Sequence, residues 1–311
     1  MTPCQYAATA SAVVLSVLLS SGVAPPARGE TPGVPPRKPV VTTTTPQATC
    51  DPATFRVILD VGHTAQVPGA TSARGNHEYD FNLSLAKVIE RDLLAAGFTR
   101  TVLLITSEPP RRGLFTRVVN ATSQKGDLFL AIHHDSVPNS FLEKWDFDGQ
   151  ERTYCDRFSG HSIFIANGNG ARNASLAFAR MLGLELKARG LQYTPHYTQA
   201  FMGHRRRQLI DAEAGVYRYD QLVVLKNTRM PAVLLEAGSI INRAEEFALM
   251  TPERQSTISA AVTEAVKAFC ATRPPRSYGQ IARQPLPSHA ATRPANPHAK
   301  ATQQRSPFTP R

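Results

Sequence analysis

Residues 55–63 have the sequence FRVILDVGH, in which an apolar run ends at a glycine and a histidine. The run is continuous rather than alternating, which indicates a strand that is covered on both faces. Similar short runs predict further buried strands at Thr101–Thr106, Asp127–His133, Ser162–Ala166, Leu222–Leu225 and Ala232–Glu236.

Helical patterns lie between these runs, at Tyr79–Ala96, Leu114–Ala121, Ala174–Lys187 and Pro252–Phe269. This alternation predicts a single α/β domain with a mostly parallel, twisted sheet and helices on both faces. In such sheets the functional groups gather at the carboxyl ends of the strands. His63 follows the first strand, His133 closes the third and Glu236 closes the last, so we expect all three at one edge.

The predicted domain covers residues 50–271 of the 311-residue chain, and the flanking segments have a different composition. Residues 1–30 contain the apolar run Ala8–Val23 followed by small residues, which predicts a signal peptide that would remove Cys4. The first six residues have no Lys or Arg, so a retained anchor is the alternative. Residues 31–49 are rich in Pro and Thr and predict a disordered linker. We therefore expect an exported protein, periplasmic or associated with the cell envelope.

The C-terminal segment 272–311 is rich in Pro and contains seven Lys or Arg and no Asp or Glu. It therefore supplies seven of the +11 formal net charges of the chain. This composition predicts a disordered basic tail that contacts an anionic envelope surface. Nucleic acid is the competing partner, since residues 205–207 add three arginines. Export argues against it, so no nucleic-acid partner is predicted.

Three cysteines follow the predicted signal peptide: Cys50, Cys155 and Cys270. An exported protein can form disulfides, and a Cys50–Cys270 bridge would join the two ends of the domain. The sequence alone does not fix the connectivity, so the pairing stays open.

Three residues suggest a metal site. Glu78 comes fifteen residues after His63, at the start of a predicted helix, and can turn towards the edge where His63 and His133 lie. Two histidine nitrogens and one carboxylate oxygen are typical of catalytic zinc, with a fourth position left for water. Singly these signals are weak, because a lone histidine at a strand end is more often structural.

The chain resembles the zinc-dependent N-acetylmuramoyl-L-alanine amidases with a phosphorylase/hydrolase-like α/β domain. The segments that carry the resemblance are LDVGH (59–63), Gly69-Ala70 leading to Glu78, Asn82-Leu83, Arg117 with Asn120-Ala121, DLFLAIH (127–133), and PAVLLEAG (231–238) with Asn242.

This resemblance implies one zinc ion per domain, held by His63, Glu78 and His133. It also implies that Glu236 accepts a proton from the attacking water and returns it to the leaving nitrogen. The implied reaction cuts the amide bond between N-acetylmuramic acid and L-alanine in peptidoglycan, in cell-wall remodelling or cell separation. An activator protein is left open as a further partner.

Several alternatives follow from the same residues. A zinc peptidase that cuts another peptidoglycan amide is the main rival, and a non-catalytic wall-binding regulator is the second. Neighbouring strand residues face opposite ways, so either His133 or His134 faces the metal, and the family register selects His133. Arg117 is interpreted as a structural partner of a carboxylate such as Asp60.

Two long stretches lie beside the predicted active edge, and long loops there are commonly lids, binding walls or plugs. The first, Val137–Gly160, is either an autoinhibitory plug or a substrate wall, and the second is Leu191–Arg218. The loop before Glu78 holds Arg74, Asn76 and His77, which either contact substrate or face solvent.

Overall fold

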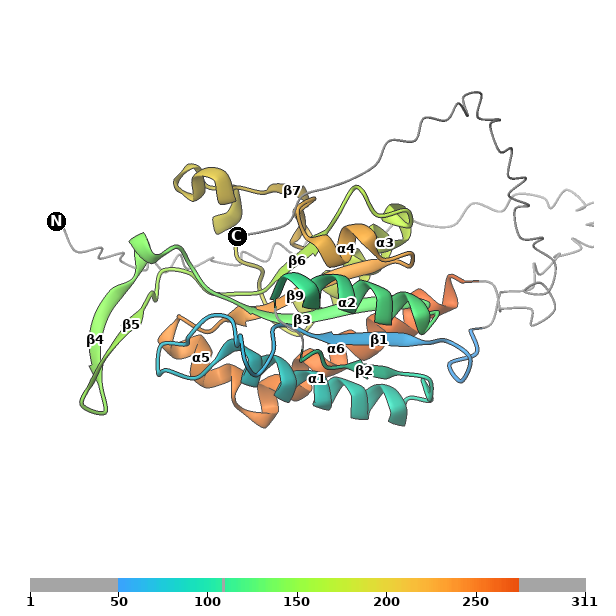
Figure 1. Ribbon diagram of the computed structural model, residues 1–311, viewed down its shortest axis with the longest axis horizontal. Coiled ribbons are helices and arrows are strands. Elements are labelled where there is room, and N and C mark those ends of the chain that lie inside the picture. The colour runs from blue at the N-terminus through green and yellow to red at the C-terminus, as the bar shows by residue number, and fades with distance from the viewer. Residues whose placement is uncertain (1–49, 108–109, 274–311) are drawn as a thin grey trace, which may run out of the picture. The chain divides into compact units, whose positions relative to one another are not determined.

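The computed structural model describes residues 50–107 and 110–273 of the chain (Figure 1). The predicted signal peptide, the linker and all but the first two residues of the predicted tail lie outside these ranges. Within them, no helix is both long and apolar enough to cross a membrane.

A seven-stranded sheet forms the centre of the domain, in the order β2-β1-β3-β9-β6-β8-β7. The pairs β1–β2, β1–β3, β3–β9 and β6–β8 are parallel, whereas β6–β9 and β7–β8 are antiparallel. The prediction of a mostly parallel sheet is therefore confirmed. The strands are β1 (Val57–Val61), β2 (Val102–Leu104), β3 (Leu128–Asp135), β6 (Ser162–Ile165), β7 (Gln208–Asp211), β8 (Val216–Arg218) and β9 (Ala232–Ser239).

Helices cover both faces of this sheet. Val57, Leu59 and Val61 of β1 belong to the core on the side of α1, α3 and α6, while Ile58 belongs to the core that contains Leu225 of α4. Alternate strand residues thus enter two different cores, which explains why the strands are apolar without interruption. The helices are α1 (Glu78–Ala95), α2 (Pro110–Ser123), α3 (Arg172–Ala188), α4 (Val223–Asn227), α5 (Arg243–Leu249) and α6 (Pro252–Ala271).

The predicted strand at Leu222–Leu225 is wrong, because this segment begins the short helix α4. The amide of Lys226 donates to the carbonyl of Leu222, as in a helical turn. The buried Asn169 side chain donates to the carbonyl oxygens of Leu225 and Thr228 at 2.7 and 3.1 Å. These hydrogen bonds give partners to carbonyl groups at the end of the helix. A four-residue apolar run does not distinguish a strand from a buried helical turn, and here the tertiary contacts decide.

A disulfide between Cys50 and Cys270 joins the two ends of the domain, with their Cα atoms 5.3 Å apart. Beside it, the rings of Phe55 and Phe269 pack edge to face with centroids 6.3 Å apart. The structure thus selects the pairing that the sequence left open. Cys155 keeps a buried free thiol.

The stretch Val137–Gly160 contains the hairpin β4 (Glu143–Phe147) and β5 (Gln150–Tyr154), which extends from the carboxyl end of β3 (Figure 1). A short 3-10 turn, η1 (Asn139–Phe141), precedes it. The stretch Leu191–Arg218 contains two 3-10 segments, η2 (His196–Thr198) and η3 (Ala200–Arg205), before strands β7 and β8. Both long stretches thus contain regular secondary structure.

Candidate metal centre and active site

Three side chains that are far apart in the sequence meet at the carboxyl edge of the sheet. Glu78, the first residue of α1, lies between two histidines: its Oε2 is 3.0 Å from Nε2 of His63, and its Oε1 is 3.0 Å from Nδ1 of His133. One potential ligand atom from each residue lies within 4.8 Å of the other two. The predicted convergence of these residues at one edge is therefore observed, and the group could hold a metal ion.

Two glycines permit this close approach. A Cβ atom on Gly62 would lie 2.5 Å from the His133 ring, and one on Gly69 would lie 2.5 Å from Oε2 of Glu78. Gly69 also has a positive φ of 83°, and His63 itself has a φ of 65°. Glycine is the residue that leaves room for both rings and adopts the turn without strain.

Glu78 is held as a charged acceptor. The amide of Ala70 donates to its Oε2 at 3.1 Å, and the Asn82 side chain donates to its Oε1 at 3.2 Å. Burial acts to raise the pKa of Glu78, but its hydrogen bonds with His133 and His63 lower that pKa well below its usual range. An ionised carboxylate beside two imidazoles is a suitable ligand set for a divalent cation.

The two adjacent histidines of β3 have different surroundings. His133 is partly exposed and belongs to the three-residue cluster, whereas His134 is buried and its Nδ1 lies 2.8 Å from Oδ1 of Asn82. Burial lowers the pKa of His134 to about 3, so this ring is neutral and donates to Asn82. Asn82 also donates to Glu78, and His134 therefore supports the cluster from behind.

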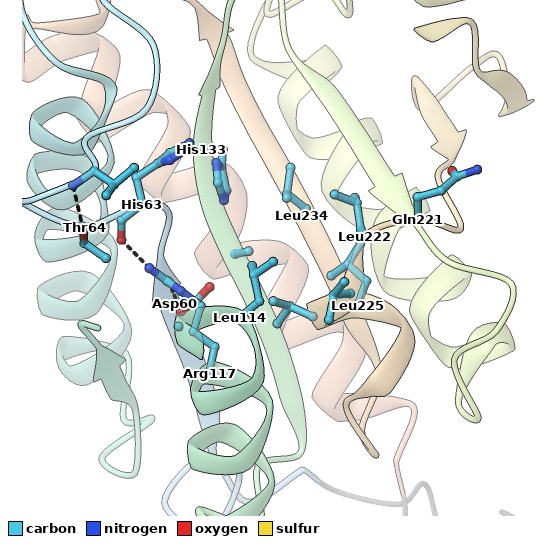
Figure 2. A pocket seen from close by; sticks show the side chains of 15 residues that line it. Asp60, His63, Thr64, Leu114, Arg117, His133, Gln221, Leu222, Leu225 and Leu234 are labelled. Atoms are coloured by element: carbon cyan, nitrogen blue, oxygen red, sulfur yellow. Dashed lines mark hydrogen bonds and ion pairs between the residues drawn. The ribbon is translucent and has the colours of Figure 1, made fainter. Parts of the chain in front are cut away.

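Arg117 of α2 holds the carboxyl end of β1. The residue is only 5% exposed, and its guanidinium lies 2.5 Å from Oδ1 of Asp60 and donates to the carbonyl of Val61 at 2.5 Å. It also donates to the carbonyl of His63 (Figure 2). The predicted pairing with Asp60 is confirmed, and Arg117 fixes the backbone from which the His63 ring projects.

A cavity of about 420 Å³ opens beside the two histidines. His63 and His133 lie at one end, and leucine side chains such as Leu114, Leu222 and Leu225 line the rest (Figure 2). The cluster therefore borders a largely apolar space between α2, α4 and the sheet.

Glu236 of β9 is the register partner of His133 on the neighbouring parallel strand. Partners in adjacent strands point to the same face, so both side chains lie on the same side of the sheet. Among the described residues its Oε2 is buried and has no hydrogen-bond partner. Burial, and then the nearby charges of Asp135 and Glu78, raise the pKa of Glu236 well above its usual range. This carboxyl group is free to interact with a substrate or water.

A family model described as N-acetylmuramoyl-L-alanine amidase matches residues 57–268. This chain belongs to that family. Its family match covers the sheet, all three residues of the cluster and Glu236.

Individual relatives are distant. The putative N-acetylmuramoyl-L-alanine amidase of Buchnera aphidicola is 24% identical over 222 residues, which cover 68% of this chain and 95% of that protein. The probable cell wall amidase LytH of Staphylococcus aureus is 24% identical over 215 residues, and the match spans 57% of its length and 68% of this chain. The chain thus matches little more than half of LytH.

Solved structures show the same fold. The amidase Ami1 of Mycobacterium smegmatis superposes with a TM-score of 0.55 at 18% identity, over 72% of this chain and 100% of that one. The catalytic domain of CwlV from Bacillus (Paenibacillus) polymyxa superposes with a TM-score of 0.50 at 25% identity, over 70% of this chain and 99% of that one. The match with Ami1 concerns the fold alone.

Other residues of this amidase-family chain form a buried polar group beside Glu236 that the sequence did not predict. The Tyr197 hydroxyl donates to both carboxylate oxygens of Asp135, at 2.9 and 2.8 Å. His196 Nε2 lies 3.9 Å from the same carboxylate. Burial raises the pKa of Asp135 to about 7, against the opposing hydrogen bond from Tyr197.

The loop before Glu78 is held by the hairpin β4–β5. Trp145 Nε1 donates to the carbonyl of Ala73 at 3.1 Å, and Arg74 lies 5.7 Å from the centroid of the Trp145 ring. Arg74 also pairs with the buried Glu246 at 2.5 Å, so it is engaged within the protein. Asn76 and His77 remain exposed.

Proposed function

We propose that this chain is a zinc-dependent enzyme that hydrolyses the amide bond between N-acetylmuramic acid and L-alanine in peptidoglycan. The observation that carries the proposal is the meeting of His63, Glu78 and His133 at the sheet edge, with Glu236 in register on the next strand. The family match supports the same reaction.

The donor set fits zinc. Two imidazole nitrogens and one carboxylate oxygen, with a cavity beside them, correspond to a catalytic site that has three protein ligands. When bound in such a set, zinc polarises a carbonyl group and lowers the pKa of water. We assign the ligand roles to His63, Glu78 and His133.

Glu236 is assigned the proton transfers. Its carboxylate accepts a proton from the attacking water, the carbon–nitrogen bond of the amide breaks, and the carboxyl group gives the proton to the leaving L-alanine nitrogen. Its Oε2 forms no hydrogen bond with any described residue.

The substitution Glu236→Gln tests this role. We expect the variant to bind zinc as the wild type does and to lose at least about a hundredfold in turnover, because it cannot accept a proton. Glu213→Gln is the matched control, since Glu213 is an exposed carboxylate elsewhere. Turnover of the Glu236→Gln variant equal to that of the control would refute the assignment.

We assign the stretch Val137–Gly160 to a substrate wall rather than a plug. The hairpin packs on the loop before Glu78, and the side chains of His63 and His133 keep 32% and 19% of their surface exposed. A segment that covers the metal site would bury both rings. Deletion of the hairpin should weaken peptidoglycan binding, and a rise in basal activity would contradict the assignment.

We also propose export to the cell envelope, with residues 1–30 as a signal peptide, 31–49 as a linker and 272–311 as a basic tail. The amidase CwlD of Clostridioides difficile was solved in complex with the lipoprotein GerS. CwlD has the same fold as this chain, with a TM-score of 0.51 at 18% identity over 70% of this chain and 100% of that one. A protein activator of this chain is a separate proposal, which a pull-down from envelope extracts would test.

A further inference from the structure

A second cavity of about 420 Å³ lies where the two long stretches meet. Arg157 and Phe158 line it from the first stretch, and residues between Gln192 and Phe201 line it from the second. It is distinct from the leucine-lined cavity beside His63, with which it shares no residue. Its polar and aromatic lining suits a ligand that carries hydrogen-bonding groups.

Among the described residues that line this second cavity, Arg157 alone has a formal charge. Its guanidinium carbon lies 5.0 Å from the centroid of the Phe158 ring and 4.9 Å from that of Phe201. It makes no ion pair with any residue that the structure describes, although its side chain is exposed. Stacking on aromatic rings holds the planar group in place and leaves its N–H edge free, which is an arrangement that suits a carboxylate.

Neutral polar groups line the same cavity. Gln192 and Gln199 are among the lining residues, and His196, which is 3% exposed, has an Nε2 without a hydrogen-bond partner among the described residues. The other ring nitrogen of His196 lies 2.6 Å from the Thr194 hydroxyl. The lining residues that the structure describes include no Asp or Glu. The charge balance therefore favours an anionic ligand.

The cavity adjoins the Glu236 side of the candidate active site. His196, on its wall, lies 3.9 Å from the carboxylate of Asp135, which is two residues beyond His133 on β3. The next residue, Tyr197, donates to that carboxylate. Through His196 and Asp135, the wall of this cavity therefore lies next to the strand that carries His133.

We infer that this cavity binds a free carboxylate of the peptidoglycan stem peptide, with Arg157 as the residue that selects it. The inference rests on the proposed function for the identity of the substrate. Stem peptides contain free carboxylates unless these are converted to amides, so Arg157 distinguishes the acid form from the amide form. The role is in binding and specificity, not in bond cleavage.

The test compares two synthetic substrates, N-acetylmuramoyl-L-alanyl-D-glutamate and N-acetylmuramoyl-L-alanyl-D-isoglutamine, with the zinc-loaded full chain. For the acid substrate, Arg157→Ala should raise KM about tenfold with kcat unchanged, because a charge-assisted hydrogen bond is lost. For the amide substrate, the same variant should change KM less than about twofold. Arg205→Ala is the matched control, because Arg205 is exposed and does not line the cavity.

The outcomes separate the inference from the proposed function. If the wild type cleaves both substrates but Arg157→Ala has the same KM as the wild type for the acid form, the inference is overturned while the function stands. If the wild type cleaves neither substrate, the function fails. The inference is then judged by calorimetric titration with L-alanyl-D-glutamate: weaker binding to Arg157→Ala than to Arg205→Ala supports it, and equal or undetectable binding overturns it.

Discussion

The buried pair of Arg117 and Asp60 gives the sharpest prediction about how the metal site is supported. Arg117→Met leaves the Asp60 carboxylate, 2% exposed, without its cation and leaves the carbonyls of Val61 and His63 without a donor. Removal of one partner from a buried ion pair costs about 3 to 5 kcal/mol. We therefore expect a loss of about 4 kcal/mol in the free energy of unfolding, a large share of the total for a domain.

Urea unfolding of the metal-free protein measures this loss, and a competition titration measures zinc affinity. Because Arg117 holds the backbone of His63, we expect zinc affinity to fall by about 10- to 100-fold. The double variant Asp60→Asn/Arg117→Met removes the stranded charge and should recover part of the stability. Arg91→Met, in an exposed Arg–Asp pair, should cost far less. A loss below about 1 kcal/mol for Arg117→Met would refute the reasoning.

Three further predictions concern stability and the metal site. Replacement of Cys50 and Cys270 by serine should cost up to about 5 kcal/mol in urea unfolding, since the bridge spans 220 residues, and equal stability of both forms would contradict this. Burial lowers the pKa of His161 to about 4 from 6.5, so the unfolded state binds more protons between these values. His161 should therefore contribute a loss of stability of up to about 1.4 kcal/mol per unit as pH falls from 6.5 to 4, and His161→Gln should reduce the slope by that amount in thermal melts. Gly62→Ala should weaken zinc binding at least about tenfold in a competition titration, because its Cβ would lie 2.5 Å from the His133 ring. Gly170→Ala is the control and should leave zinc binding unchanged, since a Cβ there meets open space.

The sequence was sufficient for the elements that carry a strong pattern. The continuous apolar runs of β1, β3 and β9 predicted the centre of the sheet, and the ends of these strands placed His63, His133 and Glu236 at one edge. The hairpin β4–β5 was missed although Trp145, Phe147 and Tyr154 alternate with polar residues. Its apolar side packs on a loop rather than in the main core, so hydrophobicity alone gave too weak a signal.

Other features depend on contacts between distant segments. The run Leu222–Leu225 suits a strand or a helix, and only its packing and the Asn169 hydrogen bonds make it helical. The contacts of Asp135 with Tyr197 and His196 join residues about sixty positions apart and follow no local pattern. Such pairs appear only when the fold brings the two long stretches together.

Mass spectrometry of purified peptidoglycan digested with the zinc-loaded full chain tests the central claim most directly. A chelated sample and the Glu236→Gln variant serve as controls. The account predicts metal-dependent release of intact stem peptides with a free L-alanine amine, and no release in either control. Cuts within the stem peptide, or no products from the zinc-loaded chain, would contradict it.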